Sequence, residues 1–210
     1  MPEVAQEARF MGAVTALSMH EMQNILAIIR ESAGLMGDIL KVNARVDFKH
    51  RPNMERTLEH ISSHVDRGKG LLEATSRLAH SPDDDLLEGC DLTVYARTVA
   101  LLSERLVRLK GATVSFSGPH TALPVAVGAL RVLMTGYKAV QWAVGNGVKD
   151  GVVGLDVEEG REFHVLSVRP PQGAAPDQDG VAFLGALLDD GRVEWDGSRL
   201  RIFLPVRRQG

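Results

Sequence analysis

Two long stretches of helical periodicity constrain the fold of this chain more than any other feature. No proline occurs between about residue 10 and residue 42, and apolar residues there recur in steps of three, four, seven and once eight. This is the spacing of one face of a helix. The first stripe consists of Phe10, Val14, Leu17, Ile25, Ile28, Leu35, Ile39 and Val42. The second, with steps of three or four only, consists of Met54, Leu58, Ile61, Val65, Gly68, Leu72, Thr75 and Ala79. The two stripes predict two long amphipathic helices.

The segment between the stripes is polar and short, which favours an antiparallel helical hairpin. It ends in Arg51-Pro52, where proline is expected to break the helix, and Asn53 is a plausible N-cap of the second helix. A lone hairpin buries only one side of each helix. We therefore expect two copies to pair as a homodimeric four-helix bundle.

The pattern changes after Ser81–Asp85, which predicts a linker between a helical domain at residues 1–82 and a second domain at residues 88–208. Helices are predicted at residues 93–109, 124–144 and 181–188, and strands at 113–117, 152–157, 163–168, 193–195 and 200–204. Gly111 suits a helix C-cap, Asp196-Gly197 suits a hairpin turn, and residues 170–180 suggest a loop. The predicted class is α+β: a long helical hairpin, then a small α/β sandwich with helices on one face of a largely antiparallel sheet.

Composition excludes several classes of protein. The net charge of -3 over 210 residues gives no basic field for nucleic acid. Cys90 is the only cysteine, so no intrachain disulfide is possible. No run of about 18 apolar residues predicts a membrane span. The N-terminus lacks the basic and apolar regions of a signal peptide. We expect a cytoplasmic protein that binds neither nucleic acid nor membrane.

The run Ser18-Met19-His20-Glu21-Met22-Gln23-Asn24 on the first helix is the best candidate for chemistry. His20 follows Leu17 by three residues, so we expect it at the edge of the buried stripe. Imidazole can accept and pass on a group near neutral pH. Glu21 could hold the Nδ1 proton and leave Nε2 as the nucleophile, and Asn24, one turn on, could orient an oxyanion. The alternative is a solvated surface histidine.

A metal site is the other interpretation of these histidines. A His-Glu-x-x-His motif would place two zinc ligands on one helix face, but the fifth residue here is Asn24. His60 and His64 have the right spacing for two ligands and no obvious third. We therefore predict no metal site in this chain.

The run around His20 resembles the H-box of sensor histidine kinases. In that family the H-box helix and its partner helix form the dimerisation and histidine-phosphotransfer domain, and an ATPase-like α/β domain follows. The resemblance continues through the element order to Gly180–Gly185 and Gly191–Trp195, and so covers nearly the whole chain.

Three features of the ATPase-like domain depart from the family pattern. Thr135 and Ala139 stand where asparagines, one of them a magnesium ligand, are expected. The adenine-binding Asp-x-Gly-x-Gly loop is replaced by Ser167-Val168-Arg169-Pro170-Pro171-Gln172-Gly173, and the phosphate loop is reduced to Asp179-Gly180. Phosphate loops need glycine because the backbone must approach closely. We expect a degenerate domain that binds no cofactor.

Together these features resemble the ChpT-like histidine phosphotransferases of two-component phosphorelays. The resemblance implies that His20 passes phosphate between the aspartates of two response regulator receiver domains, which would supply Mg²⁺. Glu21 and Asn24 would assist. The expected receiver-docking residues are Ala27, Arg30, Glu31, Gly34, Leu35 and Asp38, with the start of the second helix. An active histidine kinase, a non-catalytic regulator that binds a kinase or receiver, and a dimeric scaffold remain as alternatives.

Overall fold

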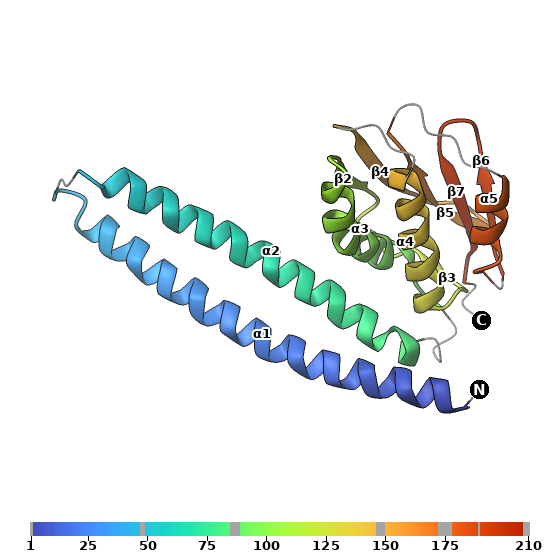
Figure 1. The fold of residues 1–210 in the computed structure, drawn as a ribbon, viewed down its shortest axis with the longest axis horizontal. Coiled ribbons are helices and arrows are strands. Elements are labelled where there is room, and N and C mark those ends of the chain that lie inside the picture. Colours follow the sequence, from blue (N-terminus) through green and yellow to red (C-terminus); the bar gives the residue numbers. More distant parts are fainter. Residues whose placement is uncertain are drawn as a thin grey trace.

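The fold is a long helical hairpin with an α/β domain beside one half of it (Figure 1). The structure is a computed structural model that describes residues 2–46, 49–84, 89–145, 150–171, 178–188 and 190–207. Helix α1 spans Pro2–Val42 and α2 spans Arg51–Asp84. At 1.5 Å per residue these helices are about 60 and 50 Å long. The predicted hairpin is confirmed, and its tip lies far from the α/β domain.

The α1–α2 seam uses the predicted stripe of α2. Leu58, Val65 and Leu72 are buried there. On α1, however, the residues turned toward α2 include Ala33 and Leu40, which are not members of the predicted stripe. Where glycine occurs the helices approach closely: a Cβ on Gly68 would lie 3.0 Å from Leu26.

The tip of the hairpin is closed by Arg51. Its guanidinium donates to the backbone carbonyls of Leu40 at 2.7 Å and Val46 at 2.8 Å, and also to that of Asn43. These carbonyls lie at and beyond the C-terminal end of α1, where a cation is favourable. Helix α2 begins at Arg51 itself, so the predicted break at Arg51-Pro52 and the N-cap at Asn53 are wrong. Proline is tolerated in the first helical turn because its missing N–H has no partner there.

The other end of α2 differs from the prediction in a similar way. The helix runs through Ser81-Pro82 to Asp84, so most of the predicted linker is helical, and residues 85–88 lie outside the described residues. Pro82 has no N–H to donate to the carbonyl of Leu78, four residues before it. The Ser81 hydroxyl donates to that carbonyl instead, at 2.8 Å, and Ser81 is fully buried.

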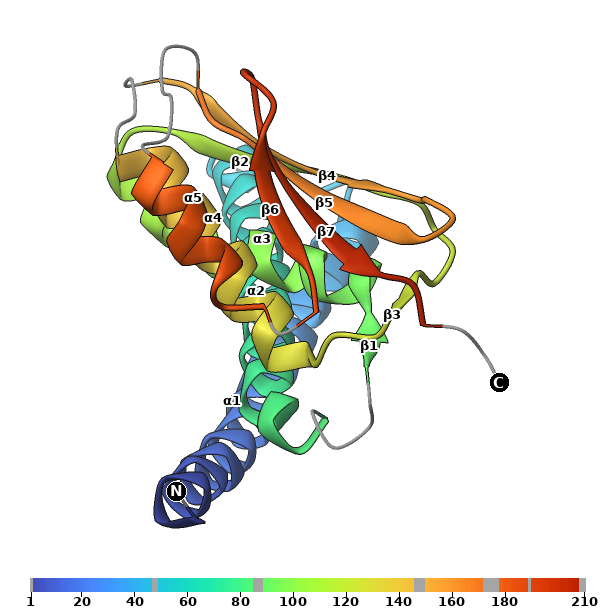
Figure 2. The same ribbon diagram turned by 90° about the vertical axis from the view of Figure 1, so that its right-hand side faces the viewer.

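The α/β domain consists of a five-stranded sheet with three helices on one face (Figure 2). The strand order is β2-β4-β5-β7-β6; only β2 and β4 are parallel. The elements are α3 (Leu92–Leu109), β2 (Thr113–Ser117), α4 (Ala129–Gly145), β4 (Val152–Glu158), β5 (Phe163–Arg169), α5 (Gln178–Gly185), β6 (Arg192–Trp195) and β7 (Leu200–Pro205). The predicted class and the largely antiparallel sheet are confirmed.

Two helices of this domain differ locally from their predictions. Residues 124–128 are not helical: β3 (Pro124–Val125) pairs with β1 (Cys90–Asp91), and α4 starts five residues late. An apolar run alone does not distinguish a buried strand from a buried helix. Helix α5 lies three residues earlier than predicted. Of the predicted loop 170–180, residues 172–177 lie outside the described residues.

The predicted turn signals of the domain are confirmed. Gly111 follows the C-cap of α3 with φ +77°, and its N–H donates to the Arg108 carbonyl at 3.0 Å. Gly197 has φ +97° in the β6–β7 turn. Such positive φ values favour glycine.

His164 is the buried histidine of the domain, with 4% of its surface exposed. Its Nδ1 accepts a hydrogen bond from the Gly160 N–H at 3.2 Å, which places the ring proton on Nε2. Burial lowers the pKa of His164, an effect that nearby Glu159 and Asp91 partly oppose.

Candidate functional site

The candidate site is an exposed face of α1 that starts at His20. His20, Glu21 and Asn24 are all exposed. Within the described residues, no hydrogen bond or ion pair holds any of the three side chains. The ring of His20 is thus open to a partner, and the assisting roles of Glu21 and Asn24 stay predictions.

The six predicted docking residues are exposed as well. His20, Ala27, Glu31, Gly34 and Asp38 follow one another in steps of seven, four, three and four, so they share one face of the helix. Arg30 lies nearer α2, where its guanidinium pairs with Asp66 at 2.8 Å. Leu35 lies at the border between this face and the apolar stripe.

A groove between the two helices adjoins this face near the tip of the hairpin. Its volume is about 790 Å³, and Gly34 and Asp38 line it with Glu55 and Glu59 of α2. The groove is open because its α1 wall holds small residues, and a Cβ on Gly34 would contact nothing within 4 Å. From α2 the groove takes residues of its first half, and it carries more acidic than basic side chains.

The five members of the α1 stripe whose side chains the structure describes are exposed, contrary to the prediction that the stripe is buried in the hairpin. Ile25, Ile28, Leu35, Ile39 and Val42 are between 43% and 86% exposed. Ile28, for example, lies about 140° around the helix axis from Ala33, which faces α2, because successive helix residues are about 100° apart. His20 follows Leu17, whose side chain lies outside the described residues, so its predicted position at the edge of a buried stripe stays a prediction. It lies on a face distinct from both the α2 seam and the apolar stripe.

The two positions of α4 at which the resemblance places asparagines carry other residues. Thr135 and Ala139, which stand at the two expected asparagine positions, are both fully buried. Helix α5 packs beside α4, and the Arg131 guanidinium donates to the Leu187 carbonyl at 3.1 Å. Neither position offers an exposed oxygen to a metal ion, and alanine has none to offer.

The described residues contain no group of three or more His, Cys, Asp or Glu side chains placed to hold a metal ion. His60 and His64 are exposed on α2. No helix among the described residues is both long and apolar enough for a membrane span.

Sequence reasoning missed a second seam of α2. Arg67, Leu71, Ala74, Leu78 and Ser81 follow steps of four, three, four and three and lie toward the α/β domain, where Arg67 pairs with Glu104 of α3 at 3.3 Å. Ala74 and Ser81 are fully buried. The signal was present as a second heptad-like spacing, but a charge and a serine in it hid the pattern.

Comparisons with known proteins gave matches among solved structures alone. The sequence matches no protein-family model and no curated protein. The solved histidine kinase AdeS of Acinetobacter baumannii is similar at 14% identity and a TM-score of 0.46, covering 91% of this chain and 98% of that one. The blue-light activated histidine kinase EL346 of Erythrobacter litoralis is similar at 16% identity and a TM-score of 0.49, covering 75% of this chain and 62% of that one. Histidine kinase ThkA, solved with the response regulator TrrA, is similar at 17% identity and a TM-score of 0.47, covering 96% of this chain and 64% of that one. Similarity at this level does not carry function, which has to come from this chain's own residues.

Proposed function

We propose that this chain is a histidine phosphotransferase, in which His20 accepts a phosphoryl group from the aspartate of one receiver domain and passes it to the aspartate of another. The observation that carries the proposal is the position of His20. It lies exposed at one end of an uncovered face of the helical hairpin, on the H-box-like run.

The dimensions of the face suit one docked domain. From His20 to Asp38 the helix rises about 27 Å. A domain of about 100 residues has a radius of gyration of about 13 Å, and hence a diameter of about 30 Å. A receiver that contacts the groove near the tip can therefore bring its aspartate to His20. The small and apolar residues of this face suit the core of a protein interface.

The proposed chemistry requires little from this chain besides position and a nucleophile. The lone pair of His20 Nε2 attacks the phosphorus of the aspartyl phosphate. The N–P bond forms as the P–O bond to the aspartate breaks, and the aspartate leaves as a carboxylate. The ring then carries a proton on Nδ1, and Glu21 stabilises or accepts it. Asn24 orients the phosphoryl oxygens, and the receiver supplies Mg²⁺. The second transfer reverses these steps.

A second copy of the chain is the proposed occupant of the exposed apolar stripe of α1. An exposed stripe of five large apolar side chains is costly in water and marks an interface. Because the stripe follows helical spacing along a long helix, a second hairpin can pack along it as a four-helix bundle. The face of His20 and the groove stay uncovered in this arrangement.

The α/β domain is proposed to act without nucleotide. The full burial of Thr135 and Ala139 supports this part of the proposal against an active kinase. The phosphoryl donor then has to be another phosphoprotein.

Labelled phosphate transfer tests the proposal. The chain is incubated with receiver domains that carry ³²P on their aspartates, and separately with labelled ATP and Mg²⁺. We expect label from the phosphorylated receivers, none from ATP, and none on His20→Ala. His60→Ala is the matched control, since His60 is also an exposed helix histidine, and it should label normally. Label from ATP would indicate a kinase. Equal label on His20→Ala would refute the role of His20.

A further inference from the structure

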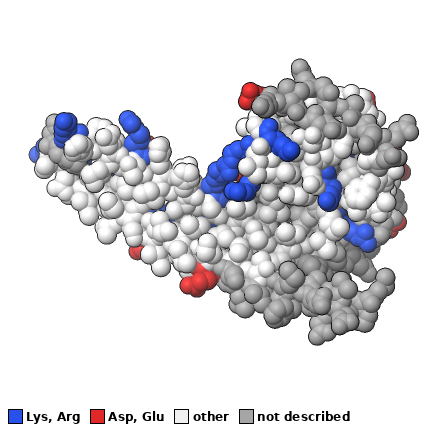
Figure 3. All heavy atoms as spheres, in the orientation of Figure 1, with Lys and Arg blue, Asp and Glu red and all other residues white. Residues whose placement is uncertain are grey.

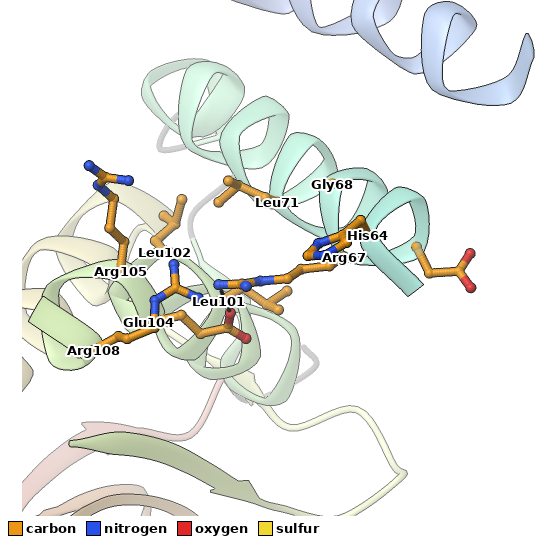
Figure 4. Close-up of a pocket in the computed structure, with 11 residues that line it drawn as sticks. His64, Arg67, Gly68, Leu71, Leu101, Leu102, Glu104, Arg105 and Arg108 are labelled. Atoms are coloured by element: carbon orange, nitrogen blue, oxygen red, sulfur yellow. Dashed lines mark ion pairs between the residues drawn. The ribbon is translucent and has the colours of Figure 1, made fainter. Parts of the chain in front are cut away.

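The crease between α2 and α3 is a cleft of about 530 Å³ outside the face of His20. Lysine and arginine side chains gather where the hairpin meets the α/β domain (Figure 3). Arg67 of α2 extends across the cleft toward α3, which contributes Glu104, Arg105 and Arg108 (Figure 4). The crease is thus lined from both parts of the molecule.

The charges of the crease leave an excess of arginine. Arg67 pairs with Glu104 at 3.3 Å, and both side chains are more than 40% exposed. Within the described residues, the guanidinium groups of Arg105 and Arg108 have no hydrogen-bond or ion-pair partner. The other carboxylate of the lining, Asp66, pairs with Arg30 of α1 at 2.8 Å. The net charge of the chain is -3, so the charge of this patch is opposite in sign to that of the chain as a whole.

The crease also has an apolar component. Leu71 is 47% exposed beside the arginines, and Leu101 and Leu102 of α3 line the cleft. Gly70 carries no side chain that would fill it, and a Cβ there would meet nothing within 4 Å. A ligand for this site needs carboxylates for the arginines and apolar side chains for the leucines.

We propose that the crease binds an acidic segment of a protein partner, in which carboxylates alternate with aliphatic side chains. Charge complementarity favours such a segment, and guanidinium groups pair well with carboxylates. A lipid bilayer is less suitable because the site is concave. A nucleic acid would gain little from two unpaired arginines beside Glu104 and three leucines. The lining of the crease does not include His20, and Asp66 is the residue that it shares with the groove near the tip of the hairpin.

Two variants of the 210-residue chain test the proposal through opposite effects. The probe is a fluorescein-labelled peptide of Glu-Glu-Leu repeats, followed by fluorescence anisotropy. Arg105→Glu/Arg108→Glu should weaken binding by at least about tenfold, since it replaces two attractions with two repulsions. Glu104→Gln should strengthen binding, because it removes a carboxylate and frees Arg67. The ion pair it breaks is a partly exposed one of small worth to the fold.

Arg45→Glu/Arg56→Glu is the matched control, since both arginines are exposed near the tip of the hairpin and the change in net charge is identical. It should leave binding within about twofold, because these sites lie beyond a Debye length of the crease. The proposal is overturned if the peptide does not bind the wild type or if both double variants weaken it equally. It is also overturned if a Glu-Glu-Ser peptide binds as tightly, or if inorganic polyphosphate binds at the crease and the peptide does not.

Discussion

Replacing Ile28 by aspartate tests the proposed pairing of two hairpins. Ile28 is 64% exposed in the single chain. Complete burial of an isoleucine stabilises by about 1.5–3 kcal/mol, so burial of the exposed part contributes about 1–2 kcal/mol per copy. A symmetric dimer counts each position twice, which gives about 2–4 kcal/mol. At about 1.4 kcal/mol per tenfold, Ile28→Asp should raise the dimer Kd by about 30- to 700-fold. Repulsion between the two aspartates adds to this.

The assay is sedimentation velocity over a concentration series, with circular dichroism to verify that the helices are intact. Because Ile28 has few contacts to lose in the single chain, the helix content should be unchanged. Leu109→Asp is the control, since Leu109 is 73% exposed at the end of α3, away from the stripe. A wild type that stays monomeric at every concentration, or an Ile28→Asp variant with an unchanged Kd, would refute the pairing through this stripe.

Three further predictions concern local structure. Ser81→Ala should lower the free energy of unfolding by about 1 kcal/mol, as measured by chemical denaturation. The loss should largely disappear in a background of Pro82→Ala, which restores a backbone N–H. The double variant therefore measures the coupling between residues 81 and 82. Arg51→Met should lower the free energy of unfolding by about 1–3 kcal/mol in the same assay, because three carbonyls lose a charged donor. Arg51→Lys should recover only part of this loss. Equal stability of the wild type and both variants would contradict the capping role of Arg51. His164→Gln should flatten the fall in stability with decreasing pH. Burial lowers the folded-state pKa of His164 below its ordinary 6.5, so its contribution is intact above pH 6.5 and is lost as pH falls from 6.5 toward the folded-state pKa. The measurement is the denaturation midpoint of the wild type and of His164→Gln between pH 7.5 and pH 5. A difference between the two midpoints that stays constant over this range would contradict the prediction.

The hairpin was predictable because it depends on a pattern that survives without tertiary context. The spacing of Leu58, Val65 and Leu72 alone fixes the face of α2 that packs on α1. The turn signals at Gly111 and Asp196-Gly197 are equally local, since they depend on backbone φ.

The errors have a common physical cause, namely a partner that the sequence pattern does not reveal. Pro52 was predicted to break the helix, but it lies in the first turn of α2, where no backbone N–H is required. Pro82 reads as a linker, but Ser81 supplies the missing donor. Pro124 begins a strand because Cys90–Asp91 pairs with it. In each case a contact outside the local pattern decides the structure.

The candidate site was predictable in part. The motif located His20, and the resemblance supplied Ala27, Glu31, Gly34 and Asp38 as docking residues, which the structure shows to be exposed. The stripe of Ile25 and Ile28 was identified but assigned to the wrong neighbour, because periodicity shows that a face is apolar and not what covers it. The α2 wall of the crease has a heptad-like spacing that includes Arg67, but local pattern does not show that Glu104, more than 30 residues away in the chain, lies opposite it.

The most direct test of the proposed function is a rapid-quench measurement of phosphohistidine in this chain after mixing with a phosphorylated receiver domain, with the modified residue located by mass spectrometry at alkaline pH. The proposal predicts that phosphate appears on His20 within the first turnovers and leaves again when a second, unphosphorylated receiver is added. Phosphate that never appears on the chain, or that appears on another histidine while His20→Ala transfers at the wild-type rate, would contradict it.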